Sequence, residues 1–242
     1  MKITELQKDL AATFRWTARL NMNEGVANHF SACVPGSSHD FYVNKAGVHF
    51  SQIKASDLIL VTKKNIDELR NKPEIVDSTA INIHGTIHEK VPHAKCIFHV
   101  HSKYSTALST LKNATLPPID QNTMRFFNRV SIYNEFGGMG FEDESIKMAN
   151  ALGNKQHMLL ANHGVITTGE TVSEGFDALY YFEKSAETYL TALSTNQELN
   201  VVSDEIAEKT AQEWANYPSD MARAHLDQIR LILDKEEPDY KN

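Results

Sequence analysis

Apolar residues recur along the chain with two different periods. Leu6, Leu10 and Phe14 lie at four-residue steps among charged residues, which predicts an amphipathic helix within residues 1–23. Residues 58–62 form an apolar run, which predicts a buried strand. Segments of both kinds alternate irregularly along the chain. This order favours a layered α/β sheet over a barrel.

The remaining elements are separated by turn residues. Further strands are expected at 25–35, 40–44, 95–101, 158–161 and 165–168, the first two around a turn at 36–38. Further helices are expected at about 78–90, 102–111, 143–153, from 172 onward and within 204–234. Thr171 and Glu174 form a capping box for the fourth of these helices. Residues 117–138 show no regular pattern.

No repeat, low-complexity segment or linker divides the 242 residues, so we expect a single domain over residues 1–242. Hydrophobic residues make up 41% and charged residues 23%, as in ordinary soluble proteins. The two cysteines, Cys33 and Cys96, fit a reduced, cytoplasmic setting better than a disulfide scaffold. Residues 1–23 are charged and amphipathic, which does not fit a signal peptide.

Charge and hydropathy limit the partners. The net charge is −7 without a basic stripe, which argues against nucleic acid and anionic membranes as partners. No apolar run approaches the roughly 20 residues of a membrane span. A small-molecule ligand is therefore the expected partner.

Three of the eleven histidines form a candidate metal site. His99 and His101 are two residues apart in a predicted strand, so both side chains face one side and can converge on one ion. Chance alone gives about half of one such pair in this composition, so the pair by itself is weak. His163 adds a third imidazole in the Asn-His-Gly turn after the strand at 158–161. Three histidines with an open position suit Zn²⁺, and also Fe²⁺, Mn²⁺ or Co²⁺.

His84 and His88 lie one helical turn apart and share a face. Each is either a group that supports the metal site or a structural helix histidine. For His88 a partly exposed structural position is the expectation, whereas for His84 both interpretations stay open. The positions His29, His49, His93 and His157 are not assigned a role from the pattern.

Several blocks in order resemble the class II aldolase and adducin head family. They are His-Val-His-Ser at 99–102, Leu-Ala-Asn-His-Gly-Val-Ile-Thr-Thr-Gly at 160–169, Asn-Lys-Ala-Gly at 44–47 and Ala-Ser-Asp-Leu at 55–58. The resemblance covers about residues 5–195 and leaves 196–242 as a C-terminal helical extension. It implies a three-layer α/β/α sandwich with a mixed, largely antiparallel central sheet.

The resemblance also implies functional residues. It maps the metal ligands of the sugar-phosphate aldolases to His99, His101 and His163, with Zn²⁺ as the ion. The carboxylate that moves the proton in those aldolases maps to Ala80, which cannot accept a proton. We therefore expect no aldol cleavage of fuculose- or rhamnulose-phosphate, and His84 or water in the role of proton carrier.

The phosphate site of the aldolases is only partly present. Ser31, Gly47, Ser78 and Thr79 match its residues and are candidates for binding substrate or an anion, since a helix N-terminus attracts negative charge. His29 and Ala46 stand where the aldolases carry Asn and Thr. These changes and Ala80 make the sequence more similar to the adducin-like members.

Two classes of function follow from the resemblance. The first is a divalent-metal-dependent lyase of aldolase or decarboxylase type, acting on a small hydroxy- or oxo-acid or a sugar derivative. The alternatives are a non-catalytic adducin-like oligomeric binding or assembly module, and an Fe²⁺ oxygenase on the same fold. The family also implies a homotetramer, and Phe126, Phe127 and Tyr133 are candidates for contacts with a neighbouring chain or for packing in their own core.

Overall fold

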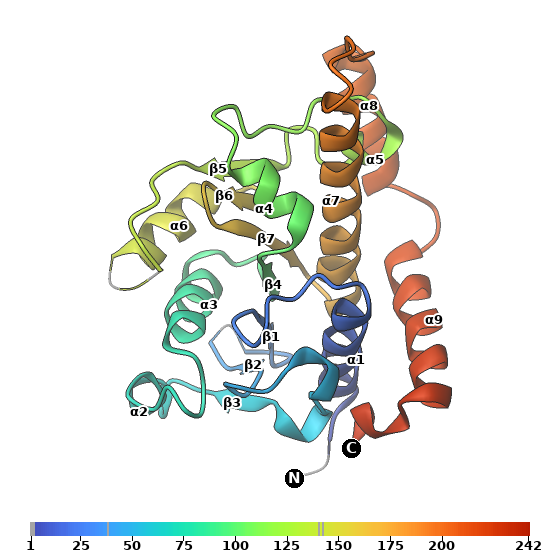
Figure 1. Ribbon diagram of the computed structural model, residues 1–242. Helices are drawn as coiled ribbons and strands as arrows, with labels where there is room; N and C mark the ends of the chain where they lie inside the picture. Colours follow the sequence, from blue (N-terminus) through green and yellow to red (C-terminus); the bar gives the residue numbers. More distant parts are fainter. Residues whose placement is uncertain (1–2, 38, 140, 142) are drawn as a thin grey trace.

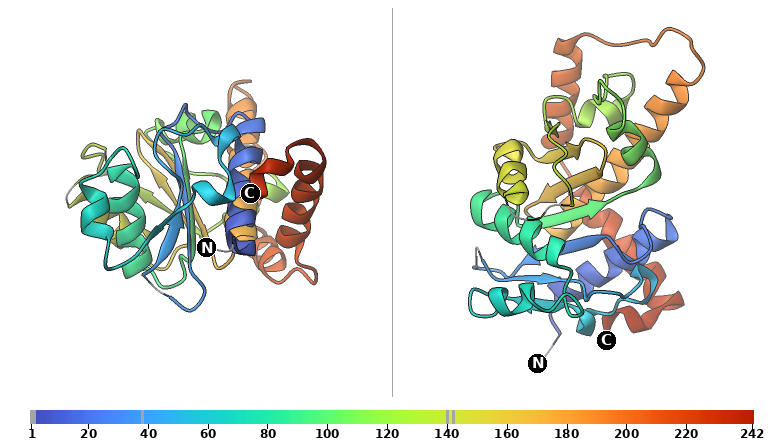
Figure 2. Two further views of the ribbon diagram at one scale, coloured as in Figure 1. Left: turned by 90° about the horizontal axis from the view of Figure 1, so that it is seen from below. Right: turned by 60° about the vertical axis from the view of Figure 1, so that its left-hand side comes forward.

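A seven-stranded sheet lies between two layers of helices in the computed structural model, which describes residues 3–37, 39–139, 141 and 143–242. Figures 1 and 2 show α1 and α7 on one side of the sheet and α3 and α6 on the other. The strands are β1 His29–Cys33, β2 Phe41–Val43, β3 Ile59–Val61, β4 Cys96–Val100, β5 Val130–Tyr133, β6 His157–Leu160 and β7 Gly164–Gly169.

The helices lie before, between and after these strands along the chain. They are α1 Glu5–Arg19, α2 Ile66–Arg70, α3 Ser78–Lys90, α4 Lys103–Ser109, α5 Gln121–Arg125, α6 Glu144–Leu152, α7 Val172–Leu193, α8 Asp204–Ala215 and α9 Met221–Glu236. Three short 3₁₀ helices span Phe50–Gln52, Ala55–Asp57 and Pro238–Lys241. Among the described residues, no helix is long and apolar enough to cross a membrane.

The strand order is β3-β2-β1-β4-β7-β6-β5, and β5–β6 is the parallel pair among antiparallel neighbours. The expected mixed, largely antiparallel sheet between helical layers is therefore confirmed. Strand β1 has a different chemistry on each face. Phe30 and Ala32 enter the core under α1 and α7, whereas His29, Ser31 and Cys33 face α3.

The core under α1 and α7 depends on one close approach. The ring of Phe98 in β4 packs beside Gly175 in α7, where an added Cβ would lie 2.5 Å from the ring. Phe98 also packs on Phe30, which stacks on Phe14 of α1 with ring centroids 4.7 Å apart. Gly175 thus allows α7 to lie close to the central strand.

Two sequence expectations differ from the structure. The apolar run at 58–62 forms β3, which is the edge strand, and of its residues only Val61 is fully buried. The irregular stretch at 117–138 contains α5 and β5, which pairs with β6.

The expected turn at 36–38 includes Ser38, which lies outside the described residues. Phe126 and Tyr133 are both 5% exposed and pack in the chain's own core.

Arginines tie α1 to the C-terminal helices. Arg15 contacts Glu237 and Asp239 at 3.1 and 3.0 Å. Asp9 in α1 accepts hydrogen bonds from Arg223 and Arg230 of α9. In Figure 1, α9 accordingly runs along the outside of α1 and α7.

Candidate metal centre

The three histidines of the candidate site come from two neighbouring parts of the sheet. His99 lies near the end of β4, and His101 is the first residue beyond the strand. His163 lies in the turn that joins β6 to β7, and β7 pairs with β4. Their ligand atoms lie within 4.8 Å of one another, so the structure brings together the three residues expected from the sequence. We call them the triad.

Hydrogen bonds at Nδ1 orient two rings of the triad. His99 Nδ1 donates to the carbonyl oxygen of Val165 at 3.0 Å, and His101 Nδ1 donates to Glu24 Oε2 at 2.5 Å. In neutral rings both Nε2 atoms then carry lone pairs, yet they face each other at 3.1 Å. Tetrahedral zinc with Zn–N distances of about 2.0–2.1 Å holds its nitrogens roughly 3.3 Å apart. This donor set therefore fits a divalent cation, which would turn the repulsion between lone pairs into attraction.

Burial favours the neutral, metal-binding form of two residues of the triad, His99 and His163. It lowers the pKa of His163 to about 4 and the pKa of His99 well below its ordinary value. Among the described residues, His163 Nδ1 is a buried atom without a hydrogen-bond partner. This nitrogen is therefore a further atom at the site that the described protein groups leave without a hydrogen bond.

The Asn-His-Gly turn is shaped by backbone geometry. Asn162 has φ +57°, and a Cβ on Gly164 would lie 2.4 Å from the carbonyl oxygen of Val100 and 3.0 Å from the His101 ring. Glycine is therefore required where the turn approaches the end of β4. The close approach places His163 beside His101, with ring centroids 4.7 Å apart.

A second set of buried side chains lies beside the triad on the α3 side of the sheet. His29 packs against His99, with ring centroids 5.0 Å apart. His29 Nδ1 lies 2.7 Å from His84 Nε2, Ser31 Oγ lies 2.5 Å from His84 Nδ1, and Ser31 Oγ lies 2.8 Å from His88 Nε2. We call His29, His84, Ser31 and His88 the histidine relay.

The structure overturns one expectation about α3 and shows the surroundings of Ala80. His88 is 3% exposed and fully hydrogen-bonded, so the expectation of a partly exposed helix histidine is wrong. Ala80 is 1% exposed within the cluster that contains Val76 and Ile81, so it does not open a space toward the site. His29 is the relay histidine whose ring packs on the triad, and His84 lies behind it. The catalytic role of His84 stays a prediction.

The four candidate anion-binding residues occupy different surroundings. Ser31 is fully buried with its hydroxyl between two imidazoles. Gly47 is exposed with φ +71°, and Ser78 donates to the carbonyl oxygen of Arg70. Thr79 lies 3.4 Å from His29 Nε2 and is the one among them that borders both the α3 N-terminus and the relay.

Two carboxylates that support the triad carry no signal in the sequence. Glu24 holds His101, and Glu183 of α7 accepts hydrogen bonds from Ser102, Tyr104 and Ser105 at the start of α4. Each acts on a segment about 80 residues away along the chain, so no local motif marks it.

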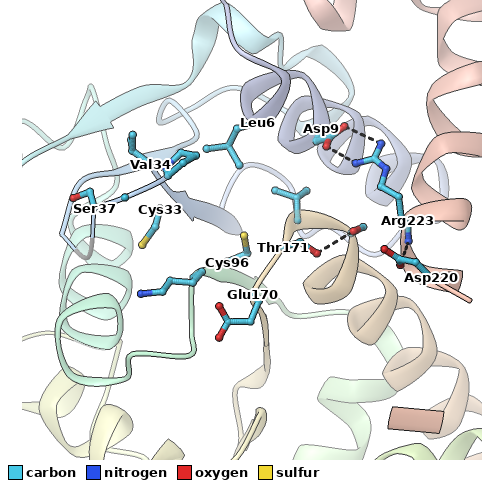
Figure 3. A pocket seen from close by; sticks show the side chains of 15 residues that line it. Leu6, Asp9, Cys33, Val34, Ser37, Cys96, Glu170, Thr171, Asp220 and Arg223 are labelled. Atoms are coloured by element: carbon cyan, nitrogen blue, oxygen red, sulfur yellow. Dashed lines mark hydrogen bonds and ion pairs between the residues drawn. The ribbon is translucent and has the colours of Figure 1, made fainter. Parts of the chain in front are cut away.

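A separate cavity of about 690 Å³ lies at the opposite ends of β1 and β4 from His29 and His99. Figure 3 shows Cys33, Cys96 and Glu170 around it, with Arg223 bonded to Asp9 at one side. Burial raises the pKa of Cys33 to about 11. Because none of the triad lines this cavity, we place the candidate site at the triad.

The chain is similar to several known proteins. A family model described as Class II Aldolase and Adducin N-terminal domain matches residues 8–190. A putative aldolase class 2 protein from Caulobacter vibrioides is 27% identical, over 96% of this chain and 90% of its own. Decarboxylase NovR from Streptomyces niveus is 30% identical over 67% of this chain and 60% of its own. Alpha-adducin from Rattus norvegicus is 27% identical over 78% of this chain and 26% of its own.

Solved structures show the same fold. An aldolase II superfamily protein from Pseudomonas syringae is 28% identical, with a TM-score of 0.86 over 98% of this chain and 95% of that one. L-fuculose 1-phosphate aldolase from Glaciozyma antarctica is 26% identical, with a TM-score of 0.82 over 98% and 92%.

Proposed function

Because the chain belongs to the class II aldolase and adducin N-terminal domain family, we propose that it is a divalent-metal-dependent lyase of aldolase or decarboxylase type. Its substrate in this proposal is a small hydroxy- or oxo-acid or a sugar derivative. The observation that carries the proposal is the pair of Nε2 atoms of His99 and His101, which face each other 3.1 Å apart beside His163. Zinc is the proposed ion, since three imidazoles suit it.

The residues of the chain have separate tasks in this proposal. The triad holds the ion, which supplies Lewis-acid polarisation of a carbonyl or carboxylate oxygen when bound. Glu24 and Val165 keep the imidazoles in the binding orientation. Ala80 cannot move a proton, so His84 takes that task through its 2.7 Å contact with His29. A decarboxylation suits this arrangement because loss of CO₂ needs an electron sink more than a base.

The second candidate is an adducin-like module without catalysis. The alignment of alpha-adducin with 78% of this chain favours it, since a fold does not fix a function. An Fe²⁺ oxygenase is the third candidate. Bound metal with exchangeable positions supports an enzyme, an empty triad supports the module, and iron with dependence on O₂ supports the oxygenase.

Metal analysis tests the proposal directly. We expect about one divalent ion per chain after incubation with Zn²⁺, Mn²⁺ or Fe²⁺ and removal of the excess. His101→Ala should lose the ion and keep its far-UV circular dichroism. The matched control is His49→Ala, because His49 bonds Asn23 and Ser51 instead of the triad. Absence of stoichiometric metal in the wild type would refute the proposed centre.

A further inference from the structure

The hydrogen bonds of the histidine relay have one direction. His88 Nδ1 lies 2.8 Å from the carbonyl oxygen of Ala94, which can only accept. His88 therefore carries its proton on Nδ1, and its Nε2 is an acceptor. The reverse tautomer would place a lone pair against the carbonyl oxygen, which costs the desolvation of two buried acceptors. The direction at this end is thus set by the backbone.

The direction passes along the relay to the triad. Ser31 has one hydroxyl proton and donates it to His88 Nε2, so its oxygen accepts from His84 Nδ1. His84 Nε2 then accepts from His29 Nδ1. His29 is left with a lone pair on Nε2. All three histidines are Nδ1-protonated, and the last one presents an acceptor.

The lone pair on His29 Nε2 lies near two further oxygen atoms, Thr79 Oγ1 and Asp77 Oδ1. This Nε2 lies 3.4 Å from Thr79 Oγ1, whose proton is committed to a shorter hydrogen bond with Asp77 Oδ1. Asp77 is the N-cap of α3 and also accepts from the Thr79 amide. Within the described part of the chain, no lysine, arginine or histidine pairs with Asp77 within 4 Å.

We propose that this end of the site, formed by His29, Asp77 and Thr79, binds a hydroxyl or another hydrogen-bond donor of the substrate and excludes a phosphate. The inference rests on the proposed function, because it assigns a substrate class to the same site. A phosphate needs donors and positive charge, whereas these groups offer lone pairs and a carboxylate. The α3 N-terminus is no substitute, since Asp77 already supplies its anion. His29 is 3% exposed and its Nε2 has a long 3.4 Å contact with Thr79, so a donor from the ligand would give this buried acceptor a shorter hydrogen bond.

The tautomers can be measured without metal or activity. In the full chain labelled with ¹⁵N-histidine, nitrogen shifts should show Nδ1–H for His29, His84 and His88. His49 is exposed, bonds Asn23 and Ser51 outside the relay, and serves as an internal reference. Ser31→Ala should leave the Nδ1–H tautomer of His88 unchanged, whereas His29 should lose its preference for a single tautomer. A proton on Nε2 of His29 in the wild type would overturn the inference.

Three probes test the selectivity on zinc-loaded protein. Glycerate, lactate and 3-phosphoglycerate share a hydroxy-carboxylate and carry a hydroxyl, a hydrogen or a phosphate at the third carbon. We expect glycerate to bind most tightly and 3-phosphoglycerate at least about tenfold more weakly, since like charges repel. Asp77→Asn keeps the cap and removes the charge, and it should recover most of the affinity for 3-phosphoglycerate. Tighter binding of 3-phosphoglycerate by the wild type would contradict the inference.

Inorganic phosphate and metal-free protein separate this inference from the proposed function. The amide resonances of Thr79 and Ala80 should stay in place on addition of phosphate to the wild type and shift in Asp77→Asn. A shift in the wild type, or none in either protein, would show that Asp77 does not exclude the anion. A failure of zinc to bind would refute the metal centre and leave the tautomer and phosphate results to decide the inference.

Discussion

At the scale of single residues, the histidines differ in what their ring nitrogens contact. In both His99 and His101, Nδ1 donates a hydrogen bond to a fixed acceptor, so Nε2 is available for a ligand. His84 and His88 use both nitrogens within the protein. His157 of β6 is 7% exposed and leaves Nδ1 buried without a partner. A buried histidine of the last kind costs stability wherever it must be protonated.

The stability of the fold should therefore fall in mild acid. Burial, with a smaller contribution from His93, lowers the pKa of His157 to about 3. Between the ordinary value of 6.5 and about 3, the unfolded chain binds this proton and the folded chain does not, so unfolding becomes easier as the pH falls. Each pH unit in that window is worth up to about 1.4 kcal/mol.

Denaturant unfolding at several pH values measures this effect. Wild type should lose up to about 2 kcal/mol between pH 6.5 and pH 5 because of His157. His157→Leu removes the proton site and an unpaired atom, so its free energy of unfolding should depend less on pH. Parallel pH dependences in the two proteins would show that His157 has the same pKa in the folded and the unfolded chain and would contradict this prediction.

At the scale of elements, α7 positions the segment that follows His101. Glu183 is 7% exposed and accepts hydrogen bonds of 2.6–2.9 Å from two hydroxyls and two amides at the start of α4. Ser102 is the N-cap of α4 but makes no side-chain cap of its own, so the carboxylate from α7 takes that part. The end of β4 is thereby fixed from outside its own sheet.

Glu183→Gln should lower both stability and metal affinity. Removal of the charge weakens several charge-assisted hydrogen bonds, for which we expect a loss of about 2–3 kcal/mol in the free energy of unfolding. Zinc should bind more weakly because His101 loses its support. Glu187→Gln is the control, since Glu187 lies on the same helix and pairs with Lys184 at the surface. Equal zinc affinities of wild type and Glu183→Gln would contradict this account.

Elements with local signals could be predicted, whereas those that depend on distant partners could not. Helix α3 lies at 78–90 as expected, because Asp77 caps its start and Pro92 favours its end. Strand β5 has four residues in an irregular stretch and exists through its pairing with β6. The triad was predicted from residue types and spacing together with the family resemblance, because the pair His99 and His101 is weak by itself. The relay was not predicted, because its order follows from how β1 and α3 pack.

At the scale of the whole molecule, exposed apolar side chains occur between β5 and α6, and one of them, Phe136, lies beside the triad. Phe136, Met139 and Phe141 are 53%, 69% and 48% exposed, and the Phe136 ring lies 6.3 Å from that of His163. Large exposed apolar groups are typical of a surface that contacts a ligand or another chain. In the tetramer that the family resemblance implies, a neighbouring chain would lie near Phe136.

We therefore expect a mass of about four times the 27.2 kDa of one chain in light scattering at micromolar concentration. Phe136→Ser should lower that mass, because it removes an exposed aromatic group from the expected contact. Leu231→Ser is the matched control, because Leu231 is equally exposed on α9 and lies on another part of the surface. A monomeric wild type would refute the tetramer.

The arginine contacts between α1 and α9 bear on how the protein is made. Arg223 and Asp9 are 214 positions apart, and Arg15 and Glu237 are 222 apart. A ribosome that adds about 5–20 residues per second needs roughly 10–40 s to bridge such an interval. During that time Asp9 lacks the arginines of α9, and Arg15 has the carbonyl oxygen of Ile53 but lacks Glu237 and Asp239. Chaperones that cover nascent chains would therefore find their target at residues 5–19 until synthesis passes α9.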